Sequence, residues 1–449
     1  MTPRLLFCAP ASGGGKTTVT CAVLRAFLRR GLKPMACKSG PDYIDPMFHS
    51  RVLGARSCNL DLFFFSKSTA RALLARNAEH AGVTVLEGAM GYYDGIAMSS
   101  DASAYDLART TETPAVLVVD GRGRALSAAA EIQGFLAFRQ PSQIAGVLLN
   151  RVSPMLYPRL AETITKETGL PVFGYLPVME DCAVESRHLG LVTAAEIEDL
   201  QEKLDRLAAQ AEKTVDLDGL LALARTAPDL KDRLPELEVV AGNPRIAVAK
   251  DKAFCFYYAD SLRVLEDLGA ELVEFSPLTD RALPAGTQGL YLGGGYPELY
   301  AKELAENASM RRSIHDAVLA GLPTVAECGG FLYLHRTLQD PNGNPWPMAG
   351  VLEAEAYPTG KLGRFGYVTL TARTGSLLFK EGETIPAHEF HYWDSTAPGT
   401  DFTAQKPQSN RSWEAAVVTK SLYAGFPHFH FASYPEAARR FLEAARIYR

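Results

Sequence analysis

The sequence contains no long apolar run, no CxxC cysteine pair and no large excess of charge. Because no apolar stretch reaches about 20 residues, we expect no membrane-spanning helix. The first residues show no charged region, long apolar core and cleavage site, so we expect no signal peptide. The cysteines are odd in number, seven in all, which favours neither a disulfide framework nor a structural zinc site. We therefore expect a protein of the reducing cytoplasm.

A formal net charge of -5 gives no reason to expect nucleic acid or an anionic membrane as a partner. Any anion-binding site must be local. With 449 residues the chain is too long for one ordinary domain, so we expect two or three. The sequence leaves the oligomeric state open, a homodimer included.

Short runs rich in Val, Ile and Leu alternate with helical patterns, and this alternation occurs in two separate parts of the chain. It predicts an α/β fold with two mostly parallel sheets. The expected strands are 5–9, 34–38, 83–86, 115–119 and 144–149, then 245–249, 271–275, 289–292 and 324–326. A charged, helix-forming stretch with two late prolines separates the sets. We expect a first domain over 1–197, a helical connector over 198–243 and a second domain over 244–449.

A glycine-rich segment, Ser12-Gly-Gly-Gly-Lys-Thr-Thr18, lies between the first strand and the first helix. Such a turn points backbone N–H groups at phosphate oxygens, and the helix adds its positive end. Lys16 would neutralise phosphate charge and Thr17 would hold Mg²⁺. Pro10 replaces the first glycine of the motif, but Gly15-Lys16-Thr17 at its end is intact. This favours nucleotide binding over a flexible turn without a ligand. The expected contacts are Ser12, Gly13, Gly14, Gly15, Lys16, Thr17 and Thr18.

Four acidic residues follow predicted strands of the first domain. Asp42 and Asp45 lie in a loop rich in turn residues, Glu87 ends a buried strand, and Asp94 comes shortly after it. A carboxylate at the end of a strand, in a sheet that carries a phosphate loop, is well placed to hold Mg²⁺. We favour this function for Asp45 and Glu87. Asp42 and Asp94 fit a turn residue or a helix cap equally well.

Cys328 ends a β-run and precedes two glycines and a helix, which is the form of a nucleophile elbow. The helix N-terminus favours the thiolate. Backbone N–H groups of Gly294 and Gly295 could form an oxyanion hole. Candidate bases are His388, His391, His428 and His430. Taken alone, Cys328 could equally be a core residue, and alternate histidines in a strand could be packing residues or a metal pair.

Together these motifs resemble the cobyrinate a,c-diamide synthase family, in the same order over nearly the whole chain. The segments that carry the resemblance are Ser12–Thr17, Lys38–Asp45, Asn59–Asp61, Glu87–Gly95, Leu149–Arg151, Arg187–Leu191, Ala253–Tyr258, Gly293–Glu298, Glu327–Gly330, His388–His391 and His428–Phe431. The combination is more specific than the phosphate loop or the cysteine alone.

The resemblance implies a dethiobiotin-synthetase-like ATP domain fused to a class I, flavodoxin-like glutamine amidotransferase domain. It implies amidation of the a and c carboxylates of cobyrinate, a tetrapyrrole of cobalamin biosynthesis. ATP and Mg²⁺ would form an acyl phosphate, and ammonia released from L-glutamine would displace phosphate.

The resemblance also assigns roles to single residues. Cys328 is the nucleophile, and the base is His428 or His430. Residues at the other sites are Asp42, Asp45 and Glu87 for metal and carboxylate activation, Asn150 for adenine, and Asp94, Arg187 and His188 for the substrate. For Arg187 and His188 the alternative is a structural loop. There is no His-Pro-x-Glu run, so a third triad carboxylate is not identified.

Three other interpretations remain open. The same motifs would serve amidation of sirohaem or nickel-sirohydrochlorin, since only the macrocycle pocket would differ. A P-loop switch or partitioning-type ATPase would need no amidation, but the cysteine elbow on a second domain argues against it. An inactive glutaminase domain could act only as a scaffold while free ammonia is used.

Overall fold

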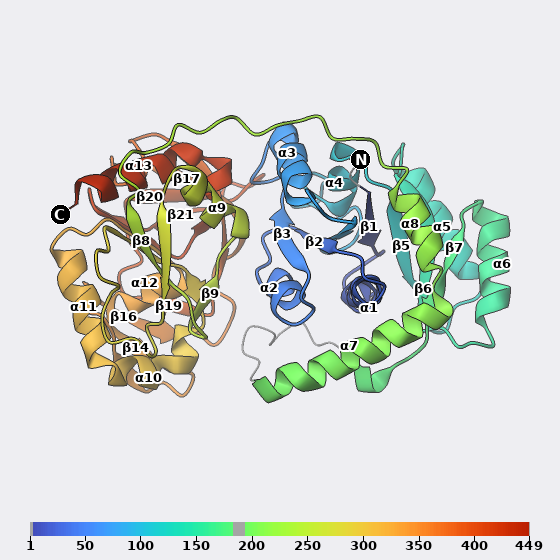
Figure 1. The fold of residues 1–449 in the computed structure, drawn as a ribbon, viewed down its shortest axis with the longest axis horizontal. Helices are drawn as coiled ribbons and strands as arrows, with labels where there is room; N and C mark the ends of the chain where they lie inside the picture. Colours follow the sequence, from blue (N-terminus) through green and yellow to red (C-terminus); the bar gives the residue numbers. More distant parts are fainter. Residues whose placement is uncertain (1–2, 183–193, 449) are drawn as a thin grey trace. The chain divides into compact units, whose positions relative to one another are not determined.

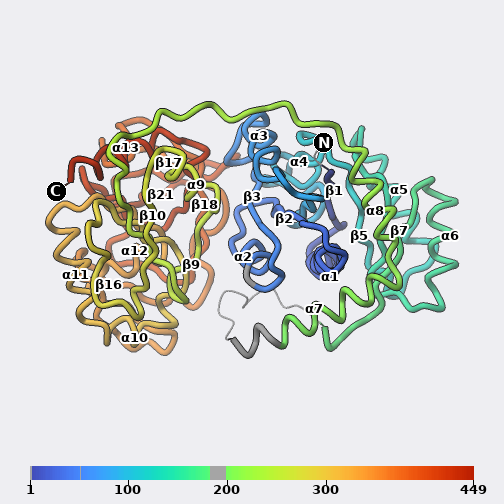
Figure 2. The backbone as a smooth tube through the Cα atoms, in the orientation of Figure 1, coloured from blue at the N-terminus to red at the C-terminus, as the bar shows by residue number. Residues whose placement is uncertain are grey.

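The computed structural model describes residues 3–182 and 194–448. The chain divides into two compact units, Met1–Pro235 and Glu236–Arg449. Each unit has a hydrophobic core of its own. Residues 228–240 belong to neither helix nor strand, and in Figure 2 the tube after α8 continues without helical coils. The described residues include no helix that is both long and apolar enough to cross a membrane.

A seven-stranded parallel sheet forms the centre of the first unit, in the order β3-β2-β4-β1-β5-β6-β7. Its strands are β1 (Arg4–Cys8), β2 (Pro34–Ser39), β3 (Arg56–Leu60), β4 (Val83–Glu87), β5 (Ala115–Asp120), β6 (Ile144–Asn150) and β7 (Val172–Leu176). Strands β1, β2 and β4 are buried along their whole length, as strands covered on both faces must be. The predicted parallel α/β architecture is confirmed.

The helices of the first unit include two from the segment expected to be a connector. In chain order they are α1 (Lys16–Arg29), α2 (Ile44–Arg51), α3 (Lys67–Asn77), α4 (Ala104–Thr110), α5 (Leu126–Phe138), α6 (Tyr157–Thr168), α7 (Ala194–Thr214) and α8 (Leu217–Ala224). Helix α7 passes next to α1, which is seen nearly end-on in Figure 1, and buries Leu204 and Leu207 in the same core. The Arg25 guanidinium donates to Asp205 at 2.8 Å. These helices are thus part of the first unit, and the chain leaves it only after Pro235.

The strand order decides where the phosphate loop lies. Strand β4 lies between β1 and β2, and Glu87 is in register with Phe7 on one side and Lys38 on the other. Parallel strands end at one edge of the sheet, so the loop after β1, Lys38 and Glu87 meet there.

The second unit contains a six-stranded sheet in the order β10-β8-β11-β13-β23-β22, parallel except for the last strand. Its strands are β8 (Arg245–Ala249), β10 (Glu271–Phe275), β11 (Gly289–Leu292), β13 (Thr324–Glu327), β22 (Val417–Val418) and β23 (Leu422–Gly425). The described helices here are α9 (Ala259–Asp267), α10 (Ala301–Glu306), α11 (Ala308–Leu319), α12 (Gly329–Tyr333) and α13 (Pro435–Ile447), with short 3₁₀ turns η3 (Pro297–Tyr300) and η4 (Phe431–Ser433). The second predicted parallel set is confirmed.

Three smaller sheets in the second unit have no counterpart among the predicted strands. A short antiparallel pair joins β9 (Phe254–Phe256) to β12 (Gly294–Gly295). The other two contain β14 (His335–Gln339), β15 (Pro345–Pro347), β16 (Leu352–Pro358) and β19 (Trp393–Ser395), and β17 (Phe365–Ala372), β18 (Thr384–Phe390), β20 (Phe402–Gln405), β21 (Ser412–Ala415) and β24 (His428–Phe429). The last sheet carries two of the candidate histidines.

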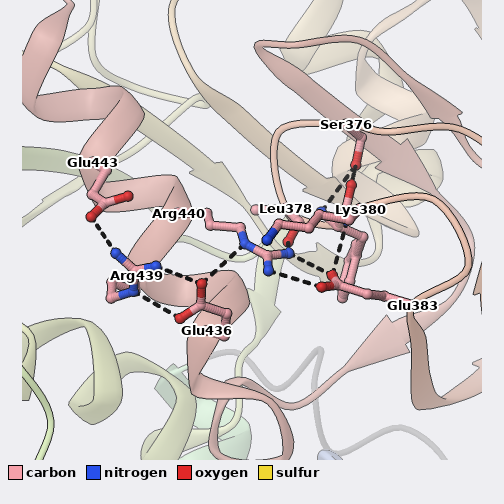
Figure 3. Close-up of polar contacts among 9 residues, drawn as sticks. Ser376, Leu378, Lys380, Glu383, Glu436, Arg439, Arg440 and Glu443 are labelled. Atoms are coloured by element: carbon pink, nitrogen blue, oxygen red, sulfur yellow. Dashed lines mark hydrogen bonds and ion pairs between the residues drawn. The ribbon is translucent and has the colours of Figure 1, made fainter.

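Ion pairs attach α13 to the loop before β18 (Figure 3). Arg440 donates to the Glu383 carboxylate at 2.9 Å and to the Leu378 carbonyl at 3.0 Å. Glu436 accepts from Arg440 at 3.2 Å and also from Arg439. The hydrogen bond from Arg440 lowers the pKa of Glu383 from 4.5 to about 2.

We expect Glu383→Gln to reduce the free energy of unfolding of the second unit by about 1 kcal/mol at pH 7, since the pair is partly solvent-screened. The folded pKa is depressed, so this stability is present above pH 4.5 and lost as the pH falls towards about 2. Denaturant unfolding at several pH values should show the two proteins converging over that range. The control is Glu443→Gln, which removes an exposed partner of Arg439 and should change stability by under about 0.5 kcal/mol. A pH-independent difference would contradict the prediction.

Candidate active sites

The phosphate loop joins β1 to α1 through two glycines in left-handed conformation. Gly13 has φ 78° and Gly15, the residue before the helix, has φ 87°. The Asn150 amide donates to the Gly14 carbonyl at 3.2 Å. The positive φ of Gly15 would strain any side chain at this position, and an added side-chain carbon would also lie 1.9 Å from Asn150 Nδ2. Asn150, which was expected to contact the adenine, stabilises the loop through this hydrogen bond.

Two lysines place positive charge at this loop. The Lys16 ammonium donates to the backbone carbonyls of Ala11, at 3.3 Å, and Met90. Burial and the nearby Lys38 lower the pKa of Lys16. Two buried cations that repel each other favour a polyanion between them.

A buried ion cluster lies beside the loop at the ends of β2 and β4. The Lys38 ammonium donates to Glu87 Oε1 at 2.9 Å and forms an ion pair with Asp45. The Thr17 hydroxyl donates to the same Glu87 oxygen at 2.7 Å. Although burial disfavours the charged form of Asp45, Lys38 outweighs it and lowers its pKa. The structure therefore brings together the three residues predicted to hold the metal.

The oxygen donors of this cluster fit Mg²⁺. This ion is usually held by one or two carboxylates together with water and phosphate oxygens, and here two carboxylates already bind one cation, the Lys38 ammonium. Glu87 Oε2 has no hydrogen-bond partner among the described residues. In that same part of the chain, no group of three or more His, Cys, Asp or Glu side chains forms a complete metal cage. Phosphate and water oxygens would complete the shell.

Two members of this cluster, Lys38 and His49, were not among the residues predicted for the site. The placement of Lys38 beside Glu87 depends on the β2–β4 register, which its motif in the sequence does not reveal. His49, on α2, is fully buried, and its Nε2 lies 3.6 Å from Glu87 Oε2. Burial lowers the pKa of His49. Its position one helical turn after Asp45 was the available signal.

Asp42 and Asp94 both make turn contacts. Asp42 Oδ1 accepts from the Ile44 N–H at 2.8 Å, and burial, reinforced by Asp45, raises the pKa of Asp42 to about 6. Asp94 Oδ2 accepts from the Gly91 N–H at 3.0 Å. A turn role does not exclude substrate contact, so both remain predictions. Arg187 and His188 lie outside the described residues.

A cavity of about 440 Å³ opens on the other side of the phosphate loop. The loops after β5, β6 and β7 line it, with Arg122, Arg151 and Pro177 among its residues. Arg151 donates to the Gly13 carbonyl at 3.2 Å and to Asp120 at 2.8 Å. The cavity therefore adjoins the loop on the side away from Lys38.

The nucleophile elbow of the second unit has the strained backbone that its form predicts. Cys328, between β13 and α12, has φ 46° and ψ −98°. Its N–H donates to the Gly425 carbonyl at 2.7 Å, and the Gly329 N–H bonds to its sulfur. Cys328 is 8% exposed, and burial raises the pKa of its thiol. A buried thiol of this kind needs a base.

His428 lies between the elbow and the glycine strand β12. Its Nδ1 is 3.4 Å from Glu327 Oε2. Its other edge faces Gly294, since an added side-chain carbon there would lie 2.6 Å from His428 Cε1 and 3.2 Å from Nε2. A side-chain carbon added to Gly329 would lie 3.0 Å from the Gly295 nitrogen. The elbow therefore lies close to His428 and to both candidate oxyanion glycines.

The other candidate histidines have different contacts. His430 Nδ1 accepts from the Ala432 N–H at 3.1 Å and lies 3.1 Å from Ser261 Oγ, and the ring stacks on Tyr258. These contacts cap η4. His391 Nε2 lies 3.3 Å from Glu389, and its ring stacks on Phe426. His388 is in register with His428, and burial lowers its pKa to about 3.

Comparison with known proteins identifies a domain in each unit. Residues 5–191 match the CobQ/CobB/MinD/ParA nucleotide binding domain, and residues 245–436 match the CobB/CobQ-like glutamine amidotransferase domain. Cobyrinate a,c-diamide synthases are similar over nearly their whole length. That of Caldanaerobacter subterraneus subsp. tengcongensis is 40% identical over 96% of each chain. That of Thermoplasma volcanium is 40% identical over 98% of this chain and 97% of its own, and that of Salmonella typhimurium 39% identical over 97% and 96%. The chain belongs to the cobyrinate a,c-diamide synthase family of glutamine-dependent amide ligases.

Proposed function

We propose that this chain uses ATP and glutamine to amidate the a and c side-chain carboxylates of cobyrinate through acyl phosphates. One observation carries the proposal. A single chain holds a phosphate loop with a buried Lys38–Asp45–Glu87 cluster and, in its other unit, a cysteine elbow with His428 beside it. A carboxylate does not condense with ammonia unaided, so one site must activate it and the other must deliver ammonia.

In the first unit, a carboxylate oxygen of the substrate attacks the γ-phosphorus of ATP. The bond to ADP breaks, and an acyl phosphate forms. Lys16 and Lys38 lie where they would stabilise charge on the transferring group, and Asp42 and Asp45 would position the attacking carboxylate. Mg²⁺, held by Thr17, Asp45 and Glu87, would neutralise phosphate charge. Ammonia then attacks the acyl carbon, phosphate leaves, and the nitrogen loses a proton to give the amide.

The nucleoside of ATP would occupy the cavity lined by Arg151, the residue that follows Asn150 in the chain. This placement is supported by the position of the cavity at the ends of β5 to β7, next to the phosphate loop. Nucleotides bind at the carboxyl ends of strands in such sheets. Asn150 would then both brace the loop and contact the adenine.

In the second unit, we assign the base to His428 rather than His430. The Cys328 thiol passes its proton to His428 Nε2, and the sulfur attacks the amide carbon of glutamine. Donors near Gly294, Gly295 and Gly329 would stabilise the developing oxyanion. His428 returns the proton to the leaving nitrogen, ammonia departs, and water hydrolyses the thioester to release glutamate and the free thiol.

The test is mass spectrometry of the protein with ATP, Mg²⁺, glutamine and one tetrapyrrole at a time. Each amidation replaces a hydroxyl by an amine and lowers the mass by about one unit. Two successive decreases with cobyrinate are expected. A decrease only with sirohaem or nickel-sirohydrochlorin would move the activity to that substrate, and none with any of the three would overturn the proposal.

A further inference from the structure

The ring of His428 contacts Glu327 on one edge and faces Gly294 on the other. A histidine base needs one nitrogen free of hydrogen to accept the thiol proton, so its other nitrogen must carry the N–H. An acceptor for that N–H fixes the tautomer and the ring orientation, and a negatively charged acceptor also stabilises the imidazolium. In His428, Nε2 lies on the edge that faces Gly294, and Nδ1 faces Glu327.

Glu327 has the position and the burial that this task needs. It is the last residue of β13, directly before Cys328, and it is 1% exposed. Its Oε2 lies 3.4 Å from His428 Nδ1. The same carboxylate accepts from the Tyr291 hydroxyl at 3.4 Å and from the Phe429 N–H at 3.5 Å. All three contacts are long and therefore weak, and of the three partners only the His428 imidazolium would carry a positive charge that balances the carboxylate.

Two other carboxylates near the elbow are less suited to the task. Glu389 already contacts His391 Nε2 at 3.3 Å and Trp413 Nε1 at 3.1 Å. The charge of Glu298, in η3, opposes ionisation of the Cys328 thiol, and burial raises the pKa of Glu298 to about 7. The direct effect of Glu327 on Cys328 is also unfavourable, because a negative charge opposes the thiolate. A useful role for Glu327 must therefore act through His428.

We propose that Glu327 is the third member of a Cys328–His428–Glu327 triad, a positioning residue that orients His428 and stabilises its protonated form. The proposal rests on the glutaminase chemistry assigned above. It gives this chain a triad acid that precedes the nucleophile, instead of one that follows the histidine in a His-Pro-x-Glu run.

The first test is Glu327→Gln, which keeps an oxygen for the Nδ1–H but removes the charge. We expect kcat for glutamine hydrolysis to fall about 100-fold with KM within about threefold, the size of effect expected when proton transfer is impaired. The control is Tyr291→Phe, which removes a second donor to the same oxygen and leaves the ion pair. Its kcat should stay within about threefold of wild type.

A second substrate separates a charge effect from a displaced ring. Hydroxylamine is a weaker base than ammonia, so expulsion from L-glutamic acid γ-hydroxamate needs less protonation by the imidazolium. The loss in Glu327→Gln should be about tenfold smaller with the hydroxamate than with glutamine. Equal losses with both substrates, or wild-type kcat with glutamine, would overturn the proposal.

Glu327→Asp keeps the negative charge on a shorter side chain. It provides an independent test if the Glu327→Gln protein is poorly folded. Its kcat should exceed that of Glu327→Gln at least about tenfold. Similar values for the two variants would show that the charge is not what matters. Cys328→Ala serves as the reference: if it still hydrolyses glutamine, the glutaminase assignment itself fails, and the triad fails with it.

Discussion

Cys328→Ala is expected to abolish amidation with glutamine and to leave amidation with added ammonium salts close to wild type. Alanine removes the sulfur on which the glutaminyl group is transferred, so glutamine-dependent kcat should fall about 10³-fold or more. The first unit, with a core and a phosphate loop of its own, keeps the means to form the acyl phosphate. Product formation by mass spectrometry, with each nitrogen source in turn, measures both activities.

The two nitrogen sources also separate the competing interpretations. Free ammonia is mostly protonated near neutral pH, so the ammonium-supported rate of both proteins should rise as the pH is raised. Cys255→Ala, at another buried cysteine of the second unit, is the matched control and should keep both activities. Unaltered glutamine-dependent turnover in Cys328→Ala would instead mean that the second unit is a scaffold.

Most of the parallel strands and the phosphate loop could be predicted because their signals are local, although the parallel strands β3, β7 and β23 were not among the predicted strands. Strand 5–9 of the prediction is observed as Arg4–Cys8, and strand 83–86 as Val83–Glu87. Each is a short apolar run followed by turn residues, and each predicted strand of the parallel sheets lies within a residue or two of its observed bounds. The same local pattern placed Thr17 and Glu87 at one edge of the sheet.

The antiparallel strands of the second unit lacked such a signal. β14 reads His-Arg-Thr-Leu-Gln, and β24 is only two residues long. Their existence depends on pairing with distant segments, since β24 joins β18 through His428 and His388. The β-propensity of their residues is too weak to predict such strands, because tertiary contacts decide whether they form.

The partners within each site could not be predicted either, because they depend on register between strands. Lys38 reaches Glu87 only because β2 and β4 pair in one alignment. His428 and His430 are chemically alike in the sequence, yet one faces Gly294 and the other caps η4. Glu327 directly precedes Cys328 in the sequence, and only the fold brings its carboxylate to His428.

Glu87→Gln is expected to lower amidation about 10³-fold with either nitrogen source, while glutamine hydrolysis persists. The substitution removes the charge that accepts from Thr17 and Lys38 and would bind Mg²⁺. The second unit has its own core and none of these residues, so its glutaminase should be retained at least in part. Asp45→Asn should behave in the same way, since Asp45 is the other partner of Lys38.

A stability measurement keeps this prediction separate from unfolding. Loss of Glu87 leaves Lys38 paired with Asp45 alone, which should cost about 1–3 kcal/mol in the first unit. Denaturant unfolding shows whether that unit is still folded under assay conditions, and titration with ATP and Mg²⁺ reports the loss of metal-assisted binding. Glu112→Gln, which alters an exposed partner of Arg71 in the same unit, should leave amidation unchanged. A folded Glu87→Gln protein with wild-type amidation would show that the buried carboxylate serves packing alone, and the phosphoryl-transfer site would then have to be sought elsewhere around the loop.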